Sequence, residues 1–475
     1  NTATRNERDE YVAITNPTAN PVNIEGWSIT DTEGIMIFIR KGLQDTNQCN
    51  DWLILPIGAS YHTPEKFFSS GDGDAIAVAT AFVSPDSSFS VLQAELNNAS
   101  SSLYINIYQF ESPHLMDLVL DAINRGVRVR LLLEGSPPRG ISDAGLYIAA
   151  RIKEGGGEVR LVHEPFLNHA KYALIDDKTT VVISENWKNT GVPVNTTFGN
   201  RGRGIVLRDE GLADYFTKVF LNDFYRAEDS RYEYKYEYEF TITREIPGGK
   251  YTPVFEPLTI HSNLTVIPVL APDTAMSNET ILGAINSAEE TIFVKLFSTG
   301  KFWGVEPNPF IAALIEAARR GCEVKVLLDS RQYNLDDWND NDEAIAWMNS
   351  VAREENLSLY AELADLDSLG LAKIHNKGLI VDGKVVIISS LNWNANSIRN
   401  REVGVIVEND AIAAFYTGVF FHDWNISVKG EGEEEWHGGD GSKERRSTWI
   451  RIALVVFTLF ISFLIFSVVK RYQRL

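Results

Sequence analysis

Hydrophobic and polar positions follow the same order in two separate stretches of the chain. In each stretch a strand-like apolar run precedes a helix-like run and a second strand-like run. The runs are residues 103–110, 115–126 and 127–135, and then 291–298, 310–321 and 322–330. Both helix-like runs close on Arg-Gly, and Gly126 and Gly321 suit the turn that ends a helix. This order predicts a layered α/β fold built from two repeats.

Each repeat continues with two short apolar runs joined by a tight turn. These runs are residues 171–176 and 179–184 in repeat one, and 377–382 and 384–389 in repeat two. Each repeat then ends on an aromatic, helix-like segment, VFLNDF at 219–224 and VFFHDW at 419–424. The duplication therefore extends over the whole α/β part of the chain.

The stretch before repeat one has the pattern of short strands split by Asn-Pro pairs and glycines. It carries EYV at 10–12, NP at 16–17 and GWSITD at 26–31. These residues resemble a lamin-tail domain, which implies an all-β, immunoglobulin-like sandwich. Such domains usually have a strand before the E-Y-V segment, so we expect the N-terminus to be truncated or processed.

The end of the chain contains a long apolar run without a charge. Residues 452–469 (IALVVFTLFISFLIFSVV) are about long enough to cross a bilayer, and Trp449 and Tyr472 stand where interfacial aromatics belong. We therefore predict a single-pass transmembrane helix. Basic residues flank both of its ends, so charge does not decide the orientation. Six N-x-S/T sequons favour an extracellular catalytic domain.

The overall charge limits how the protein meets an anionic substrate. The chain has 44 Lys and Arg against 64 Asp and Glu, a formal net charge of −20. Such a surface repels nucleic acid and anionic lipid at long range, so a phosphodiester substrate requires a locally basic site. The two cysteines form neither a disulfide framework nor a zinc site, and we predict no metal and no cofactor.

The candidate chemistry lies in a motif that occurs once in each repeat. His169, Lys171 and Asp176 form an H-x-K-x4-D pattern, which His375, Lys377 and Asp382 repeat at the same spacing. On a strand, the His and Lys of each motif share one face and can reach one phosphate. A trailing S-x-N-W follows in both repeats, with Ser184 and Asn186 in the first and Ser390 and Asn392 in the second.

These residue types suit the cleavage of a phosphodiester bond. Such a reaction needs a nucleophile, an acid for the leaving oxygen and positive charge on the phosphoryl oxygens. Two histidines can supply the first pair. The two lysines can bind the oxygens, and the serines and asparagines can donate hydrogen bonds to phosphate. The lysines would then do the work of a divalent ion, which predicts a metal-independent phosphodiesterase.

The paired motif over residues 92–425 is similar to that of the phospholipase D superfamily. The resemblance implies two α/β/α sandwich halves that build one active site within a monomer. It also implies a phosphohistidine intermediate, with His169 as nucleophile and His375 as general acid and base; the reverse assignment stays open. Asp176 and Asp382 are catalytic candidates that would orient the histidines or brace the site, although turn residues at strand ends have the same pattern.

The two repeats differ at one position of this pattern. Repeat two has Glu402 two residues after Asn400, as many family members do, and Glu402 is expected to support the site. Repeat one has Gly202 at the equivalent position and therefore no carboxylate there. The halves are accordingly not equivalent. The interval from Asn186 to Asn200 is also longer than the equivalent interval from Asn392 to Asn400. A further hypothesis is that this longer loop shapes a substrate lid and that Arg201, Arg203 and Arg208 supply local positive charge.

The sequence divides the chain into six parts. They are a lamin-tail-like sandwich (1–85), repeat one (90–228), a β segment (229–275), repeat two (276–428), a charged Gly-rich linker (429–448) and a transmembrane helix (449–470).

The main functional prediction is a membrane-anchored phosphodiesterase that hydrolyses phospholipid or nucleic acid, DNA or RNA. A nuclease would have a basic groove with aromatic platforms for bases, and Trp187, Trp303 and Trp393 are candidates. The alternatives are a phosphatidyltransferase similar to cardiolipin synthase, and a catalytically weak surface binding protein.

Overall fold

The computed structural model describes residues 28–30, 36–38, 67–68, 78–163, 167–229 and 240–429. Of the expected N-terminal sandwich it describes four strands: β1 (Ser28–Thr30), β2 (Met36–Phe38), β3 (Phe67–Phe68) and β4 (Val78–Ser84). Strand β1 pairs antiparallel with β2. An immunoglobulin-like fold is therefore not shown. The linker and the predicted membrane helix over 449–470 lie outside the described residues and stay predictions. Within the described ranges, no helix is long and apolar enough to span a bilayer.

Repeat one is organised around a nine-stranded mixed sheet. In sheet order the strands are β11 (Glu228–Asp229), β7 (Glu158–Val162), β6 (Arg128–Glu134), β5 (Ser102–Ile107), β8 (Lys171–Ile175), β9 (Thr179–Ile183), β10 (Gly202–Arg208), β4 and β12 (Leu258–His261). The strands β5, β6 and β7 are parallel to one another. From β5 onward, through β8, β9 and β10 to β4, each strand pairs antiparallel with the next. β4 lies in the segment that we assigned to the sandwich, but it pairs with β10 in this sheet.

Repeat two has an eight-stranded sheet with the same central order. Its strands are β18 (Leu359–Leu363), β17 (Glu323–Leu328), β14 (Thr291–Leu296), β19 (Lys377–Val381), β20 (Val385–Ser389), β21 (Glu402–Glu408), β13 (Thr265–Ala271) and β3. A small hairpin, β15 (Phe302–Trp303) with β16 (Glu306–Pro307), follows β14. The two sheets thus share a seven-strand frame, in which β8 of repeat one corresponds to β19 of repeat two.

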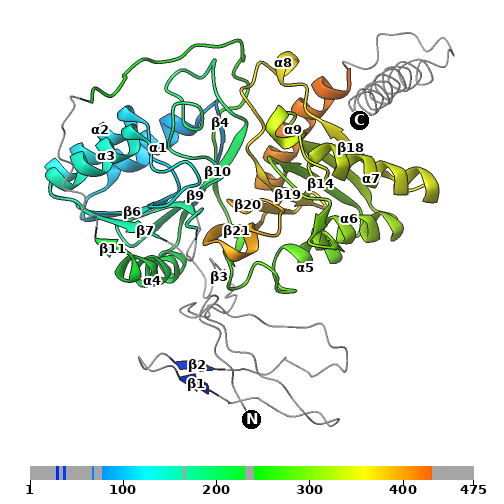
Figure 1. The fold of residues 1–475 in the computed structure, drawn as a ribbon, viewed down its shortest axis with the longest axis horizontal. Coiled ribbons are helices and arrows are strands. Elements are labelled where there is room, and N and C mark those ends of the chain that lie inside the picture. Colours follow the sequence, from blue (N-terminus) through cyan, green and yellow to red (C-terminus); the bar gives the residue numbers. More distant parts are fainter. Residues whose placement is uncertain are drawn as a thin grey trace, which may run out of the picture. The chain divides into compact units, whose positions relative to one another are not determined.

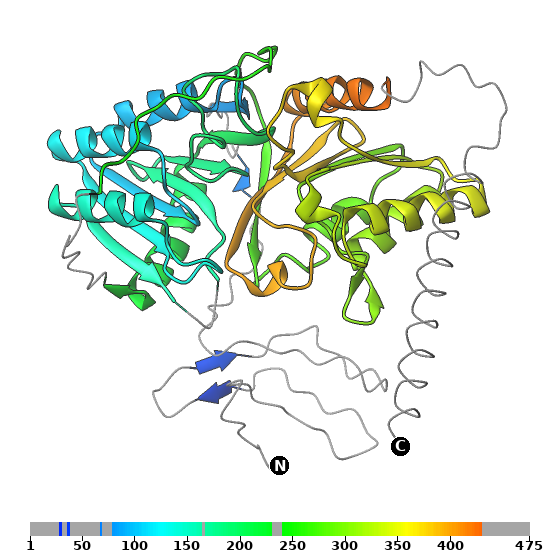
Figure 2. The same cartoon turned by 45° about the horizontal axis from the view of Figure 1, so that its top comes forward.

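Helices cover both faces of each sheet (Figures 1 and 2). In repeat one, α1 (Ser88–Asn98), α2 (Pro113–Asn124) and α3 (Asp143–Glu154) share one apolar core with the sheet, and α4 (Glu210–Arg226) stacks Phe220 on Tyr104 from the other side. In repeat two, α5 (Ile281–Asn286), α6 (Pro309–Arg319) and α7 (Asn341–Glu355) match the first three, and α9 (Asp410–Lys429) matches α4. Short α8 (Leu366–Leu369), η1 (Gln332–Asn334) and η2 (Ser397–Arg399) complete the helices of the described part. The predicted α/β layering is confirmed.

Local sequence explains where the crossover helices stop. α2 and α6 are followed by Gly126 and Gly321, whose φ angles are +89° and +105°. Residues with a side chain rarely adopt such angles, whereas glycine does so freely. The prediction that these glycines end their helices is therefore confirmed, and the chain returns from each helix into the next parallel strand.

Candidate active site

The loop that carries each motif histidine is held by the backbone of the opposite repeat. The amide of His169 donates to the carbonyl of Arg401 (2.9 Å), and the amide of His375 donates to the carbonyl of Arg201 (2.8 Å). The arginine amides donate back, to Leu167 and Lys373 respectively. Because these bonds run both ways, the two repeats hold the two histidines at one shared junction.

His169 is oriented by a carboxylate from repeat two. Its Nδ1 lies 2.8 Å and 2.9 Å from the two carboxylate oxygens of Glu402, the first residue of β21. Both side chains are buried. A carboxylate at Nδ1 accepts a hydrogen bond from the N–H of that nitrogen, which keeps the proton on Nδ1 and leaves Nε2 with its lone pair. The structure thus brings Glu402 to the nucleophile candidate, although the two lie in different repeats.

His375 faces a carboxylate that sequence reasoning missed. Its Nδ1 lies 3.1 Å from Oε2 of Glu185, a residue of repeat one that is wholly buried. Glu185 stands between Ser184 and Asn186 in the S-x-N-W segment, where repeat two has Leu391. The sequence did contain a signal for Glu185. It is a charged residue that follows an apolar strand, at a position that is apolar in the other repeat.

Burial decides the protonation of this group of side chains. Loss of solvent lowers the pKa of His169 to about 4, against the opposing effect of Glu402. Burial, with nearby Lys377 and Lys373, lowers the pKa of His375 well below its usual range. Burial also raises the pKa of Glu185 to about 7. Both imidazoles are therefore neutral at pH 7 in the absence of an anion.

The motif lysines lie beside the histidines, as predicted. Lys171 Nζ donates to the carbonyl of His169 (2.6 Å), and Lys377 Nζ donates to the carbonyl of His375 (2.9 Å). Both are fully buried, and burial lowers the pKa of Lys171 to about 7 and that of Lys377 well below its usual range. Lys373 adds a cation that repeat one replaces with Leu167. A bound anionic phosphodiester favours the charged form of each lysine, so the three lysines together supply the locally basic site that the acidic chain requires.

The predicted phosphate-binding donors have other partners. The hydroxyl of Ser390 donates to Glu402 (2.5 Å), and the hydroxyl oxygen of Ser184 accepts from the amide of Arg203 (3.1 Å). Asn186 Nδ2 donates to Gln109 (3.2 Å). The carbonyl oxygens of the Asn186 and Asn392 side chains are buried without a partner among the described residues. The serines thus brace the site, and a phosphate contact by the asparagines stays a prediction.

Asp176 and Asp382 do not reach the histidines. Asp176 accepts from the amides of Ser100, Ser101 and Ser102 at the start of β5, whereas Lys171 pairs with Ile107 at the end of that strand. Asp382 likewise accepts from three consecutive amides, those of residues 289–291. The placement of these aspartates in the catalytic group is corrected, because each one is a turn residue at the far end of its motif strand.

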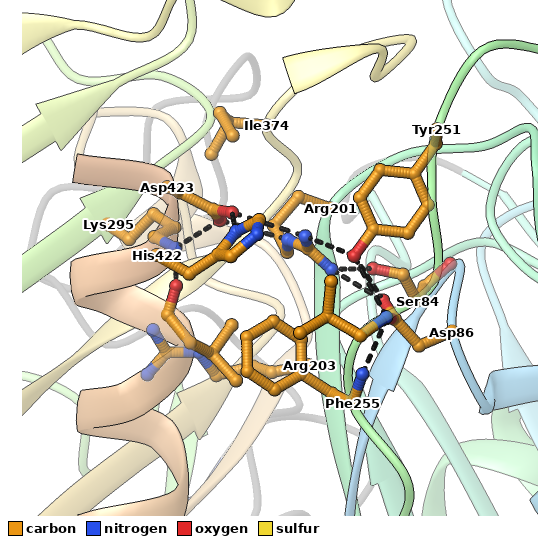
Figure 3. A network of polar contacts seen from close by, with 12 residues as sticks. Ser84, Asp86, Arg201, Arg203, Tyr251, Phe255, Lys295, Ile374, His422 and Asp423 are labelled. Atoms are coloured by element: carbon orange, nitrogen blue, oxygen red, sulfur yellow. Dashed lines mark hydrogen bonds and ion pairs between the residues drawn. The ribbon is translucent and has the colours of Figure 1, made fainter. Parts of the chain in front are cut away.

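The arginines proposed as local positive charge contact partners within the protein, and Figure 3 shows Arg201 and Arg203 among theirs. Arg201 is wholly buried and pairs with Asp86 (2.7 Å) and with Asp423 of α9 (2.9 Å). Arg203 is also buried and lies over the ring of Tyr416, while Arg208 pairs with Glu95. The hypothesis was wrong because Arg201 and Arg208 are paired with acidic residues from distant segments and Arg203 is buried against an aromatic ring.

No group of three His, Cys, Asp or Glu side chains within the described ranges is arranged to hold a metal ion.

Comparisons with known proteins agree with this geometry. The chain is 22% identical over 365 residues to a cardiolipin synthase of Clostridium perfringens, a match that covers 72% of this chain and 70% of that protein. It is also 22% identical over 350 residues to cardiolipin synthase A of Yersinia pseudotuberculosis, covering 69% of this chain and 65% of the relative. The chain thus spans just under two thirds of the second relative's length.

A solved structure supports the fold. Phosphatidylserine synthase of Haemophilus influenzae superimposes with a TM-score of 0.51 at 12% identity, over 73% of this chain and 85% of that one. The family model described as "Cardiolipin synthase, PLD-like domain" matches residues 92–224 and 281–424, which are more than half of the chain. The chain therefore belongs to the phospholipase D-like domain family of the cardiolipin synthases.

Proposed function

We propose that this protein transfers a phosphatidyl group from one lipid to the hydroxyl of another, as a cardiolipin synthase does. The observation that carries the proposal is the pair of crossed contacts, His169 with Glu402 and His375 with Glu185. Two oriented imidazoles beside two buried lysines provide a nucleophile, an acid and base, and a site for a phosphoryl group.

The prediction that the protein mainly hydrolyses phosphodiester bonds was wrong. Curated relatives that match over both repeats are named cardiolipin synthases, and the matching family model has the same description. These findings favour the phosphatidyltransferase alternative. They give no support to a nuclease. Of the tryptophans that we considered as platforms for bases, Trp187 and Trp393 are buried and Trp303 is partly buried.

In the first step Nε2 of His169 attacks phosphorus while the bond from phosphorus to the leaving alcohol breaks. A low imidazole pKa keeps the lone pair of His169 available, and Glu402 stabilises the positive charge that develops on the ring. His375 donates a proton to the leaving oxygen. The negative charge of a bound phosphodiester raises the pKa of His375, so the ring is protonated when the acid is needed.

In the second step His375 takes the proton from the hydroxyl of the acceptor lipid. The acceptor oxygen attacks phosphorus and the phosphorus–nitrogen bond breaks, which restores neutral His169. Lys171 and Lys377 stabilise the charge on the phosphoryl oxygens in both steps. Transfer and hydrolysis differ only in whether an alcohol or water occupies the acceptor position.

The test uses the full chain reconstituted with vesicles that contain phosphatidylglycerol. We expect diphosphatidylglycerol and free glycerol as products, measured by mass spectrometry. We also expect His169→Ala and His375→Ala each to lower the rate by at least about 10³-fold, because the two side chains act as one unit. His261→Ala, at the exposed end of β12, is the matched control and keeps the wild-type rate.

Phosphatidic acid as the only lipid product would show hydrolysis and contradict transfer. Full activity in either active-site variant would contradict the assigned chemistry. Acid-labile phosphate on the wild-type protein, and its absence from the His169→Ala variant, would identify His169 as the nucleophile.

A further inference from the structure

Each repeat contributes one buried carboxylate to the site, but from a different position of the repeated pattern. In repeat two it is Glu402, at the start of β21, and Leu391 stands in the S-x-N-W segment. In repeat one it is Glu185 that stands in that segment, and Gly202 begins β10. The carboxylate therefore stands at the first of these two positions in repeat one and at the second in repeat two.

The positions compete for the same space within repeat one. A Cβ atom added to Gly202 would lie 2.4 Å from Oε1 and 2.5 Å from Cγ of Glu185. Atoms that are not bonded to each other do not approach so closely, so any side chain at 202 displaces Glu185. The carboxylate of Glu185 thus fills the volume next to position 202, where the pattern of repeat two would place a glutamate.

The surroundings of the two carboxylates match as well. Asn200 Nδ2 donates to Glu185 (2.9 Å), and Asn400 Nδ2 donates to Glu402 (3.1 Å). Each carboxylate faces Nδ1 of the histidine from the opposite repeat. Position in the sequence differs, whereas each carboxylate has an equivalent asparagine donor and lies next to Nδ1 of the equivalent histidine.

We infer that the glutamate missing at position 202 is replaced by Glu185, which positions His375 in the way that Glu402 positions His169. Glycine at 202 and glutamate at 185 form a compensating pair. The inference rests on the proposed function, in which His375 is the acid and base, and it assigns a positioning residue to that histidine.

Two contacts differ between the carboxylates. His169 Nδ1 is hydrogen-bonded to Glu402, whereas His375 Nδ1 lies 3.1 Å from Glu185 without hydrogen-bond geometry. The second difference provides a readout. Glu402 accepts a hydrogen bond from the hydroxyl of Ser390, whereas Oε1 of Glu185 is buried without a partner among the described residues. Burial therefore raises the pKa of Glu185 to about 7. Turnover should fall as the pH drops through this value, because protonated Glu185 no longer stabilises the imidazolium of His375.

The experiment compares wild type with E185Q, E185L and the exchange variant E185L/G202E, which has the residues of repeat two at both positions. The rate of glycerol release from phosphatidylglycerol vesicles is measured, because this leaving group forms in transfer and in hydrolysis alike. We expect E185Q and E185L to lower kcat by about 10- to 100-fold, with KM little changed. The exchange variant restores kcat to within a few-fold of wild type.

The exchange variant should also move the acidic limb of the pH profile to a lower pH. A glutamate at 202 would accept a hydrogen bond from Ser184, as Glu402 does from Ser390, and its charged form would be stabilised. Thermal unfolding of each variant separates lost folding from lost positioning. G202E alone is expected to melt well below wild type, because Glu185 still occupies the space.

Three results would overturn the inference: wild-type kcat and pH profile in E185Q, an exchange variant that melts like wild type without recovering kcat, or G202E that melts like wild type. A histidine NMR titration gives a readout that needs no turnover. There, E185Q lowers the pKa of His375 and the exchange restores it, and an unchanged His375 pKa in E185Q counts against the inference. A wild type that releases glycerol without forming diphosphatidylglycerol would contradict only the proposed function.

Discussion

Two arginines, one from each repeat, occupy equivalent positions in clusters of different charge. Arg201 and Arg401 each follow an asparagine at the start of an equivalent strand, and each binds an aspartate in the last helix of the opposite repeat. For Arg201 the aspartate is Asp423 of α9, and for Arg401 it is Asp223 of α4. The Arg201 side chain is wholly buried, whereas 12% of the Arg401 side chain is exposed.

The Arg201 cluster contains a second cation, at a position where repeat one has a neutral residue. Lys295 of β14 also donates to Asp423 (2.5 Å), so one carboxylate serves two buried cations. The equivalent residue in repeat one is Asn106 of β5, which accepts from Asn168 (2.7 Å). A neutral amide pair thus replaces an ion pair in an otherwise repeated frame.

This difference shows how a duplicated fold specialises without changing its backbone. The carbonyl of Arg201 holds the amide of His375, and the carbonyl of Arg401 holds that of His169. The two histidine loops therefore depend on clusters that respond differently to loss of charge. A buried ion pair need not stabilise a protein overall, but removal of one partner leaves an uncompensated charge and is costly.

The largest effect should come from Asp423→Asn. This change leaves Arg201 and Lys295 with one carboxylate fewer, and we expect the free energy of unfolding to fall by about 3–5 kcal/mol. Asp223→Asn is the matched variant and should cost about 1–2 kcal/mol, because Arg401 keeps Asp273 (2.7 Å) and partial contact with water. Urea unfolding at pH 7 measures both. Equal losses would show that the additional cation has no energetic consequence.

Acidification provides a control on this first comparison. Burial opposes the charge of Asp423, but Arg201 and Lys295 outweigh burial and hold its pKa far below the usual range. A carboxylate whose pKa is lowered by folding contributes stability above its unfolded pKa of about 4 and loses that contribution as the pH falls below it. The difference in stability between wild type and Asp423→Asn should therefore begin to narrow below about pH 4.

A smaller effect, of the same size in both repeats, is expected at the turn aspartates. Asp176→Asn and Asp382→Asn should each lower the free energy of unfolding by about 1–2 kcal/mol, since a charged acceptor of several amides becomes neutral. Asparagine tolerates the positive φ of both residues, 55° and 49°, so the backbone is not strained. The value of kcat should change less than about two-fold, because the histidines are at the other end of the motif strand.

Burial alone would raise the pKa of Asp176, but its amide and hydroxyl donors lower it to about 2. Its contribution is thus complete above about pH 4 and is lost between about pH 4 and 2. Stability curves from pH 2 to pH 7 measure this, and a large loss of kcat with normal stability would return these aspartates to the catalytic group.

The fold and the motif residues were predictable because both repeat at fixed spacing. His169, Lys171, His375 and Lys377 lie together as expected. What spacing within a repeat does not reveal is contact between repeats. Glu185 was missed because its partner histidine belongs to the other repeat.

The surface role given to Arg201 failed for the same reason, because its aspartates come from β4's following turn and from α9. The motif aspartates, Asp176 and Asp382, show the opposite error, in which a regular spacing was taken as a sign of catalysis. Their spacing is regular, yet the regularity reflects a repeated turn and not chemistry.

The smallest effect should come from the glycines that end α2 and α6, where the repeats do not differ. Gly126 and Gly321 have positive φ angles, and a Cβ added to either glycine would meet no atom within 4 Å. Gly126→Ala and Gly321→Ala therefore add only backbone strain, and each should lower the free energy of unfolding by about 1 kcal/mol. Urea unfolding of both variants is the measurement. Equal losses of unfolding free energy in the two glycine variants would show that backbone strain costs the same in both repeats. If the Asp423 and Asp223 variants then lose unequal amounts, the repeats differ in their buried charges and not in their backbone geometry.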